Sequence, residues 1–169
     1  MNIWEIFKLG PRTRKPTVLG AGATLYPDKI VIETVDRIKD SYGVLSTNIT
    51  ILDPNVESNL LGQTLRHHLG QSRDDLKMIK DIEGQYAEYL KKAGFKNRKE
   101  HHRHALHLMI SQKDGKISLA PTINGGPTGK NRGFMGTKEE PIKVDINVSD
   151  PELGDIIKLG WSKCVCNCA

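Results

Sequence analysis

Two stretches far apart in the chain repeat one pattern, that of a strand end followed by a helix start. In each, a valine is followed two residues later by a capping residue, then by a Leu-Gly pair and further apolar residues at helical spacing. In the second stretch, 146–164, Asp150 is a suitable N-cap and Pro151 suits the first helical position. The matched positions are Val56 and Val148, Ser58 and Asp150, Leu61-Gly62 and Leu153-Gly154, Leu65-Arg66 and Ile157-Lys158, and Leu69 and Trp161.

The repeat predicts two strand-then-helix units, with helices over 59–71 and 151–163. We expect Gly62 and Gly154 to lie close against the sheet, because only a residue without Cβ lets two backbones approach so closely.

The other elements follow from periodicity and turn chemistry. An apolar stripe predicts the longest helix over 74–93, ending at Gly94, and Asp114-Gly115 between two β-type runs predicts a hairpin. Alternating or β-branched runs predict strands over 29–35, 46–53 and 142–148. The Pro- and Gly-containing segment 11–28 reads as a loop, and residues 2–8 fit either a strand or the first turn of a helix.

This order predicts an α+β fold, a mainly antiparallel or mixed sheet with about three helices packed on it. The chain has 169 residues, which suits one domain with a real core. We predict a single domain over 1–163 and a flexible tail over 164–169. The tail contains all three cysteines, Cys164, Cys166 and Cys168, so no disulfide framework is expected elsewhere.

Charge and hydropathy limit the partners and the cellular compartment that we expect for this chain. The net charge of +5 favours an acidic partner but does not identify nucleic acid. No apolar run approaches the roughly 18–20 residues that span a bilayer, and no basic segment precedes an apolar one at the N-terminus. We therefore expect a cytoplasmic protein with no membrane partner.

The glycine-rich loop over 124–137 is the first candidate site. It lacks the spacing of a phosphate-binding loop, since Asn124 stands where that motif needs glycine and Asn131 where it needs Ser or Thr. Its two cations and one aromatic residue, Lys130, Arg132 and Phe134, instead suit the binding of a protein partner. In the competing interpretation, Phe134 is a core side chain that pins the loop to the sheet.

The histidine-rich stretch 99–107 is the second candidate site, because imidazole can bind metals and accept protons. If 103–112 is a strand, His101 and His107 share one face with Arg103, and His102 and His104 share the other. Apart from Glu100, no carboxylate or cysteine lies nearby in sequence to complete a site. We therefore predict no catalytic residues, no metal site and no cofactor.

Taken in order, several motifs of the second half resemble the cytoplasmic immunity proteins of bacterial contact-dependent growth inhibition systems. The motifs are Leu61-Gly62 with Leu65-Arg66, Leu69 and Ser72-Arg73, the run from Ala105 through Asp114-Gly115 to Ala120-Pro121-Thr122, Gly133-Phe134, and Val148 through Gly154 to Ser162-Lys163-Cys164. The resemblance implies a non-enzymatic inhibitor that binds the cognate C-terminal toxin domain, of nuclease type, of a large exoprotein.

Two other functions stay open from the residues. One is a small basic enzyme acting on nucleic acid with His101, His102, His104 or His107, where nearby lysines and arginines would neutralise phosphates. The other is a nucleic-acid binder without catalysis, which the scarcity of aromatic residues near the basic stretch disfavours. The leading hypothesis is toxin neutralisation, with no direct contact to nucleic acid.

Overall fold

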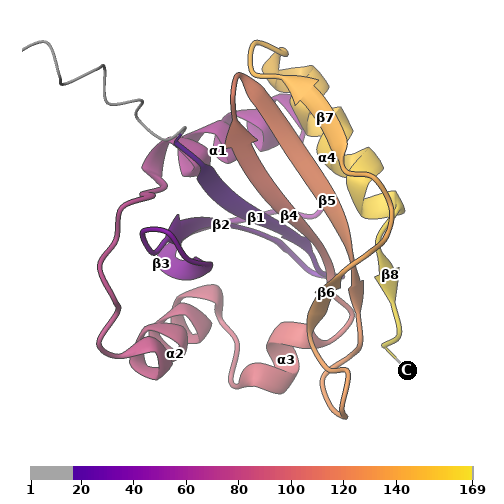
Figure 1. Cartoon of the computed structure of the whole chain (residues 1–169). Helices are drawn as coiled ribbons and strands as arrows, with labels where there is room; N and C mark the ends of the chain where they lie inside the picture. Colours follow the sequence, from indigo (N-terminus) through magenta and orange to yellow (C-terminus); the bar gives the residue numbers. More distant parts are fainter. Residues whose placement is uncertain (1–16, 169) are drawn as a thin grey trace, which may run out of the picture.

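A sheet with helices on both faces forms the protein (Figure 1). The structure is a computed structural model, and it describes residues 17–168. The elements are β1 Leu19–Leu25, β2 Ile30–Arg37, β3 Gly43–Leu52, α1 Ser58–Gln71, α2 Ile82–Ala93, α3 Arg98–His102, β4 Leu106–Lys113, β5 Lys116–Asn124, β6 Phe134–Gly136, β7 Ile142–Asp145, α4 Asp150–Ser162 and β8 Val165–Cys166.

The strand order is β3-β2-β1-β4-β5-β6, with β7 and β8 also paired to β5. All of these pairs are antiparallel except the parallel pair of β5 with β8. The predicted α+β class and mainly antiparallel sheet are confirmed. The uncertain segment 2–8 lies outside the described residues.

The hairpin between β4 and β5 forms where Asp114-Gly115 predicts it. Both turn residues have positive φ, 50° for Asp114 and 73° for Gly115. A two-residue turn of this kind matches the twist of the flanking strands, and Asp-Gly tolerates it well.

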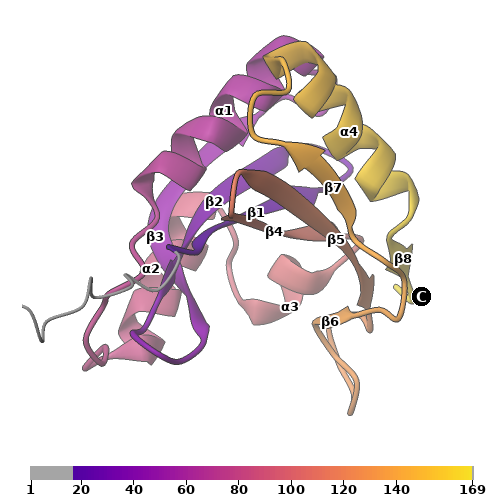
Figure 2. The same ribbon diagram turned by 45° about the horizontal axis from the view of Figure 1, so that its top comes forward.

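The two helices of the sequence repeat, α1 and α4, cover one face of the sheet together (Figure 2). Leu61 and Leu65 of α1 and Leu153, Ile157 and Trp161 of α4 are buried in the larger core. The indole Nε1 of Trp161 donates to the carbonyl oxygen of Ala23 at 3.0 Å, so its one polar atom is satisfied in the core.

The expectation that Gly62 and Gly154 lie against the sheet is wrong, because each lies against the other helix. A Cβ at Gly62 would collide with the carbonyl oxygen of Asp150, and a Cβ at Gly154 with that of Ser58. The repeat thus builds a reciprocal contact, in which each glycine receives the first residue of the partner helix.

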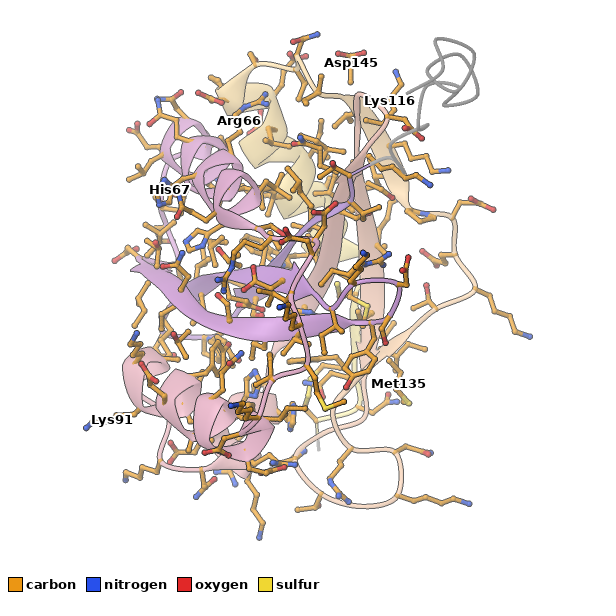
Figure 3. The ribbon with its side chains drawn as sticks, turned by 60° about the vertical axis from the view of Figure 1, so that its left-hand side comes forward. Arg66, His67, Lys91, Lys116, Met135 and Asp145 are labelled. Atoms are coloured by element: carbon orange, nitrogen blue, oxygen red, sulfur yellow. A yellow bond between two sulfur atoms is a disulfide. The ribbon has the colours of Figure 1, made fainter. Side chains whose placement is uncertain are left out.

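Arg66 adds a polar link between the two helices (Figure 3). Its Nε donates to the Asp150 carboxylate at 2.6 Å and its Nη1 to the carbonyl oxygen of Ile146 at 2.6 Å, while Nη2 donates to that of Val148. One side chain of α1 therefore fixes the connection through which the chain enters α4. The cap of α4 is Ser149, one residue before the predicted Asp150.

The loop predicted over 11–28 is wrong for residues 19–25, which form β1 between β2 and β4. Glycine is unfavourable in strands, so the glycines in this segment keep the sequence pattern from predicting β1. The fold nevertheless requires glycine at two positions of β1. A Cβ at Gly20 would lie 2.8 Å from the carbonyl oxygen of Val35, and a Cβ at Gly22 would collide with the carboxyl group of Glu33.

The helix predicted over 74–93 is wrong for its first part, because α2 begins only at Ile82. Leu76 instead pairs with Ile38 in an isolated bridge, with hydrogen bonds from Leu76 N to Arg37 O at 3.2 Å and from Lys39 N to Leu76 O at 3.0 Å. Asp81 then caps the helix by accepting from Gly84 N at 2.8 Å.

Candidate partner-binding site

The β5–β6 loop, residues 125–133, extends the β5–β6 hairpin and is held at its base by backbone hydrogen bonds. Gly125 N donates to Gly133 O at 2.9 Å and Gly133 N to Gly126 O at 3.0 Å, which closes its base. Lys130 and Arg132 are exposed near its tip, whereas Phe134 begins β6 and is half-buried. The three residues predicted to bind a partner thus divide into two solvated cations and one packed aromatic ring.

Phe134 lies among three histidines, and this joins the two candidate sites predicted separately from the sequence. Its ring stacks on His107 with centroids 4.4 Å apart and meets His102 edge-on at 5.1 Å and His101 at 5.7 Å. We call these four residues the histidine cluster.

The predicted grouping of the histidines on one strand is wrong, because β4 starts only at Leu106. His101 and His102 come from the short helix α3, which Asn97 caps by accepting from Glu100 N at 3.1 Å. His104 follows with a φ of 53° and is exposed, apart from the cluster.

Burial keeps the clustered histidines neutral. It lowers the pKa of His101 to about 3 and that of His107 to about 4, and it also lowers the pKa of His102. Tyr86 Oη lies 2.6 Å from His101 Nδ1, and Thr24 Oγ1 lies 2.8 Å from His107 Nδ1. A general base works best with a pKa near the working pH, so these rings are poorly suited to catalysis at neutral pH.

Glu33 lies beneath the histidine cluster and is not among the residues predicted from the sequence. It is 1% exposed, its Oε1 lies 3.9 Å from His107 Nδ1, and its Oε2 makes no hydrogen bond. Burial raises the pKa of its carboxyl group to about 8, although the nearby Tyr89 hydroxyl lowers it in part. The available signal was one acidic residue inside the apolar run Ile30-Val-Ile-Glu-Thr-Val35.

Two adjoining hollows open on this side of the sheet and share Leu45. One, of about 330 Å³, is lined by Tyr86, His101 and His102, and the other, of about 440 Å³, by His107 and Met109 among others. Each hollow reaches a histidine of the histidine cluster, and we call the two hollows together the groove.

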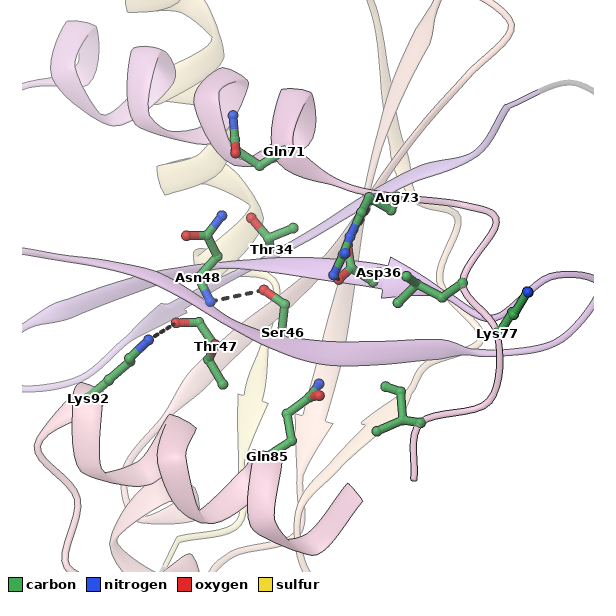
Figure 4. Close-up of a pocket in the computed structure, with 12 residues that line it drawn as sticks. Thr34, Asp36, Ser46, Thr47, Asn48, Gln71, Arg73, Lys77, Gln85 and Lys92 are labelled. Carbon is green, nitrogen blue, oxygen red and sulfur yellow. Dashed lines mark hydrogen bonds and ion pairs between the residues drawn. The ribbon is translucent and has the colours of Figure 1, made fainter. Parts of the chain in front are cut away.

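A third hollow, of about 510 Å³, is polar and lies between β3, the end of α1 and α2 (Figure 4). In it Asp36, only 3% exposed, accepts from the backbone N and the Nη2 of Arg73, both at 2.9 Å. The Arg73 side chain remains 63% exposed. The cleft therefore holds a guanidinium group in a fixed position, suited to a polar group of a partner.

Neither a metal centre nor a membrane-spanning helix is present in the part of the chain that the structure describes. Over residues 17–168, no three His, Cys, Asp or Glu side chains come together as a metal ion would require. Within the same range, no helix is long and apolar enough to cross a membrane.

Solved structures share this fold. A chain of a CdiA-CT/CdiI toxin and immunity complex from Yersinia pseudotuberculosis aligns with a TM-score of 0.73 at 18% identity, covering 88% of this chain and 98% of that one. A protein of unknown function from Neisseria meningitidis aligns with a TM-score of 0.75 at 17% identity, covering 89% and 98%. No curated protein sequence matches the chain. The chain thus has the α+β fold of a class that occurs in a toxin and immunity complex.

A family model described as CDI immunity protein matches residues 20–164. The chain belongs to this family, which confirms the resemblance to immunity proteins of contact-dependent growth inhibition.

Proposed function

We propose that this protein binds the cognate C-terminal toxin domain of a contact-dependent growth inhibition exoprotein and neutralises it in the cytoplasm of the producing cell. The observation that carries the proposal is the family match over 20–164, nearly the whole of the described chain. The neutral, buried histidines support a binding protein over an enzyme.

We place the toxin contact at the β5–β6 loop and the adjoining groove. Lys130 and Arg132 are exposed there, and Arg98 of α3 also lies close enough to His102 to lower the pKa of that ring together with Arg132. Arginine beside aromatic groups is common at the centre of protein interfaces. The cations favour an acidic toxin surface, and we expect that toxin to be a nuclease, as in the family resemblance.

Co-expression with the neighbouring toxin domain tests the function. We expect the protein to protect cells and to co-purify with the toxin domain. The proposal fails if the protein does neither. Cleavage of RNA or DNA by the purified protein alone, lost in His107→Ala, would favour the nucleic-acid enzyme instead.

The loop is tested separately by Lys130→Ala and Arg132→Ala. Both side chains are exposed, so we expect an unchanged melting temperature and, for Arg132→Ala, toxin binding at least about tenfold weaker. Lys116→Ala is the matched control, because Figure 3 shows Lys116 far from Met135, and Met135 lies in β6 directly after the loop. Equal toxin affinity in all three variants would remove the loop from the interface.

Phe134→Ala separates an anchor from a packing role. An interface residue gives weaker toxin binding with a nearly unchanged melting temperature. A core residue gives a large fall in melting temperature. The stacking of Phe134 on His107 is the observation that supports this core role.

A further inference from the structure

The C-terminal cysteines have no part in the proposed toxin contact. Cys164 lies in a different environment from Cys166 and Cys168. Cys164 is half-buried against the larger core, its Sγ donates to His107 O at 3.2 Å, and burial raises the pKa of its thiol. It is therefore an unreactive packing residue. Cys166 and Cys168 follow at alternate positions and are joined to each other by a disulfide, with their Cα atoms 5.1 Å apart. That separation is within the range of about 4.4–6.8 Å usual for disulfides.

The bonded pair flanks the contact that attaches this segment to the sheet. Cys166 pairs with Asn124 in the parallel ladder of β5 and β8, and Asn167 N donates to Asn124 O at 2.8 Å. Asn167 is thus held between the two cysteines at the point where it meets the base of the β5–β6 loop.

Asn124 connects this point to the rest of the site. It is fully buried, and its Nδ2 donates to His102 O at 2.8 Å and Ala105 O at 2.9 Å and approaches Cys166 Sγ at 3.6 Å. Its Oδ1 accepts from Gly126 N at 2.9 Å. One side chain therefore joins the end of α3, the start of β4, the loop and the C-terminal segment.

We propose that Cys166 and Cys168 form a reversible dithiol–disulfide site for small disulfides of the glutathione class, and that its state sets how firmly residues 165–168 are held against β5. The effect on residues 165–168 is entropic. A closed ring that includes Asn167 removes backbone freedom, so the hydrogen bond from Asn167 to Asn124 costs less ordering in the oxidised form. Disulfides in reducing compartments are typically transient or regulatory, as this assignment requires.

The reaction balances through two exchanges. One protein thiolate attacks a sulfur of the small disulfide, which forms a mixed disulfide and releases one small thiol. The second protein thiolate attacks the protein sulfur of that mixed disulfide, which closes the Cys166–Cys168 bond and releases the second small thiol. Two electrons pass from the protein dithiol to the small disulfide, and the two protons of the protein thiols end on the two released thiols.

The test is equilibration of the full chain in buffers of reduced and oxidised glutathione, followed by alkylation and peptide mass spectrometry. We expect the Cys166 and Cys168 thiols to disappear together as one intramolecular bond, while Cys164 stays reduced. Cys164→Ser is the matched control and should behave as the wild type does, whereas Cys168→Ser should give a glutathione adduct on Cys166. A bond that includes Cys164, or only mixed disulfides, or no thiol loss with excess oxidised glutathione, overturns the site.

A second measurement tests the attachment. Hydrogen exchange at the Asn167 amide should be several-fold faster in the reduced protein than in the oxidised one, with exchange across β1 unchanged. Equal rates at Asn167 in a protein that does form the bond would overturn the proposed effect on residues 165–168. Neither measurement requires the toxin.

Discussion

At the scale of single residues, the buried carboxyl group of Glu33 makes the free energy of unfolding depend on pH. Its pKa is raised from 4.5 to about 8 by burial, so the folded state holds this proton more tightly than the unfolded chain. The free energy of unfolding therefore falls as the pH rises between those values, by roughly 1 kcal/mol per pH unit at most. Glu33→Gln keeps the neutral shape, and we expect it to gain stability relative to the wild type up to about pH 8 and then level off.

Chemical denaturation of both proteins at several pH values measures this difference. The comparison matters because the histidines act in the opposite direction: the lowered pKa values of His68, His101 and His107 remove stability as the pH falls below about 6.5. His107 lies 3.9 Å from Glu33, so its contribution need not be the same in both proteins. Above the pKa of an unfolded-chain histidine all three rings are neutral in both states, and a difference in slope there belongs to Glu33. Parallel stability curves would show that Glu33 is ionised in the folded protein.

At the scale of elements, the pair of α1 and α4 depends on its two reciprocal glycines. Gly154→Ala should lower the free energy of unfolding by at least about 1–3 kcal/mol, because the new Cβ collides with the backbone of Ser58 and the helices must separate. Gly70→Ala is the control, since Gly70 lies in α1 with nothing within 4 Å of an added Cβ. That variant should be neutral or more stable by up to about 1 kcal/mol. Equal effects in urea denaturation would refute the close contact.

The elements that the sequence predicts well are those with strong local signals. The N-cap region and Pro151 mark α4, and Asp114-Gly115 marks the hairpin. The missed elements depend on distant partners: β1 needs glycine to make room for Glu33, and Leu76 leaves a helical stripe to pair with Ile38. The histidine cluster was missed in the same way, because Phe134 and His107 are brought together by strand pairing and not by spacing.

At the scale of the whole molecule, the two faces of the sheet are built differently. The face under α1 and α4 has the larger apolar core and satisfied polar atoms such as Trp161 Nε1. The face under α2 and α3 has a smaller core, and buried there are Glu33 Oε2, Tyr89 Oη and His102 Nδ1, none of which makes a hydrogen bond of ordinary length and angle. An unpaired buried polar atom costs about 1–3 kcal/mol, so this face has less stability to lose before it opens.

This difference predicts the order of local opening. Helix α2 has 12 residues and α1 has 14, so their amides can be compared by hydrogen exchange at nearly equal length. We expect α2 and α3 to exchange faster than α1 and α4, because only Tyr89 and Ala93 of α2 are buried, while α1 buries three leucines. Exchange in α2 as slow as in α1 would contradict the difference in stability between the two faces.

The proposed toxin contact lies on the less stable face, under α2 and α3. Toxin binding should therefore slow hydrogen exchange in α2, α3 and the β5–β6 loop and leave exchange in α1 and α4 unchanged.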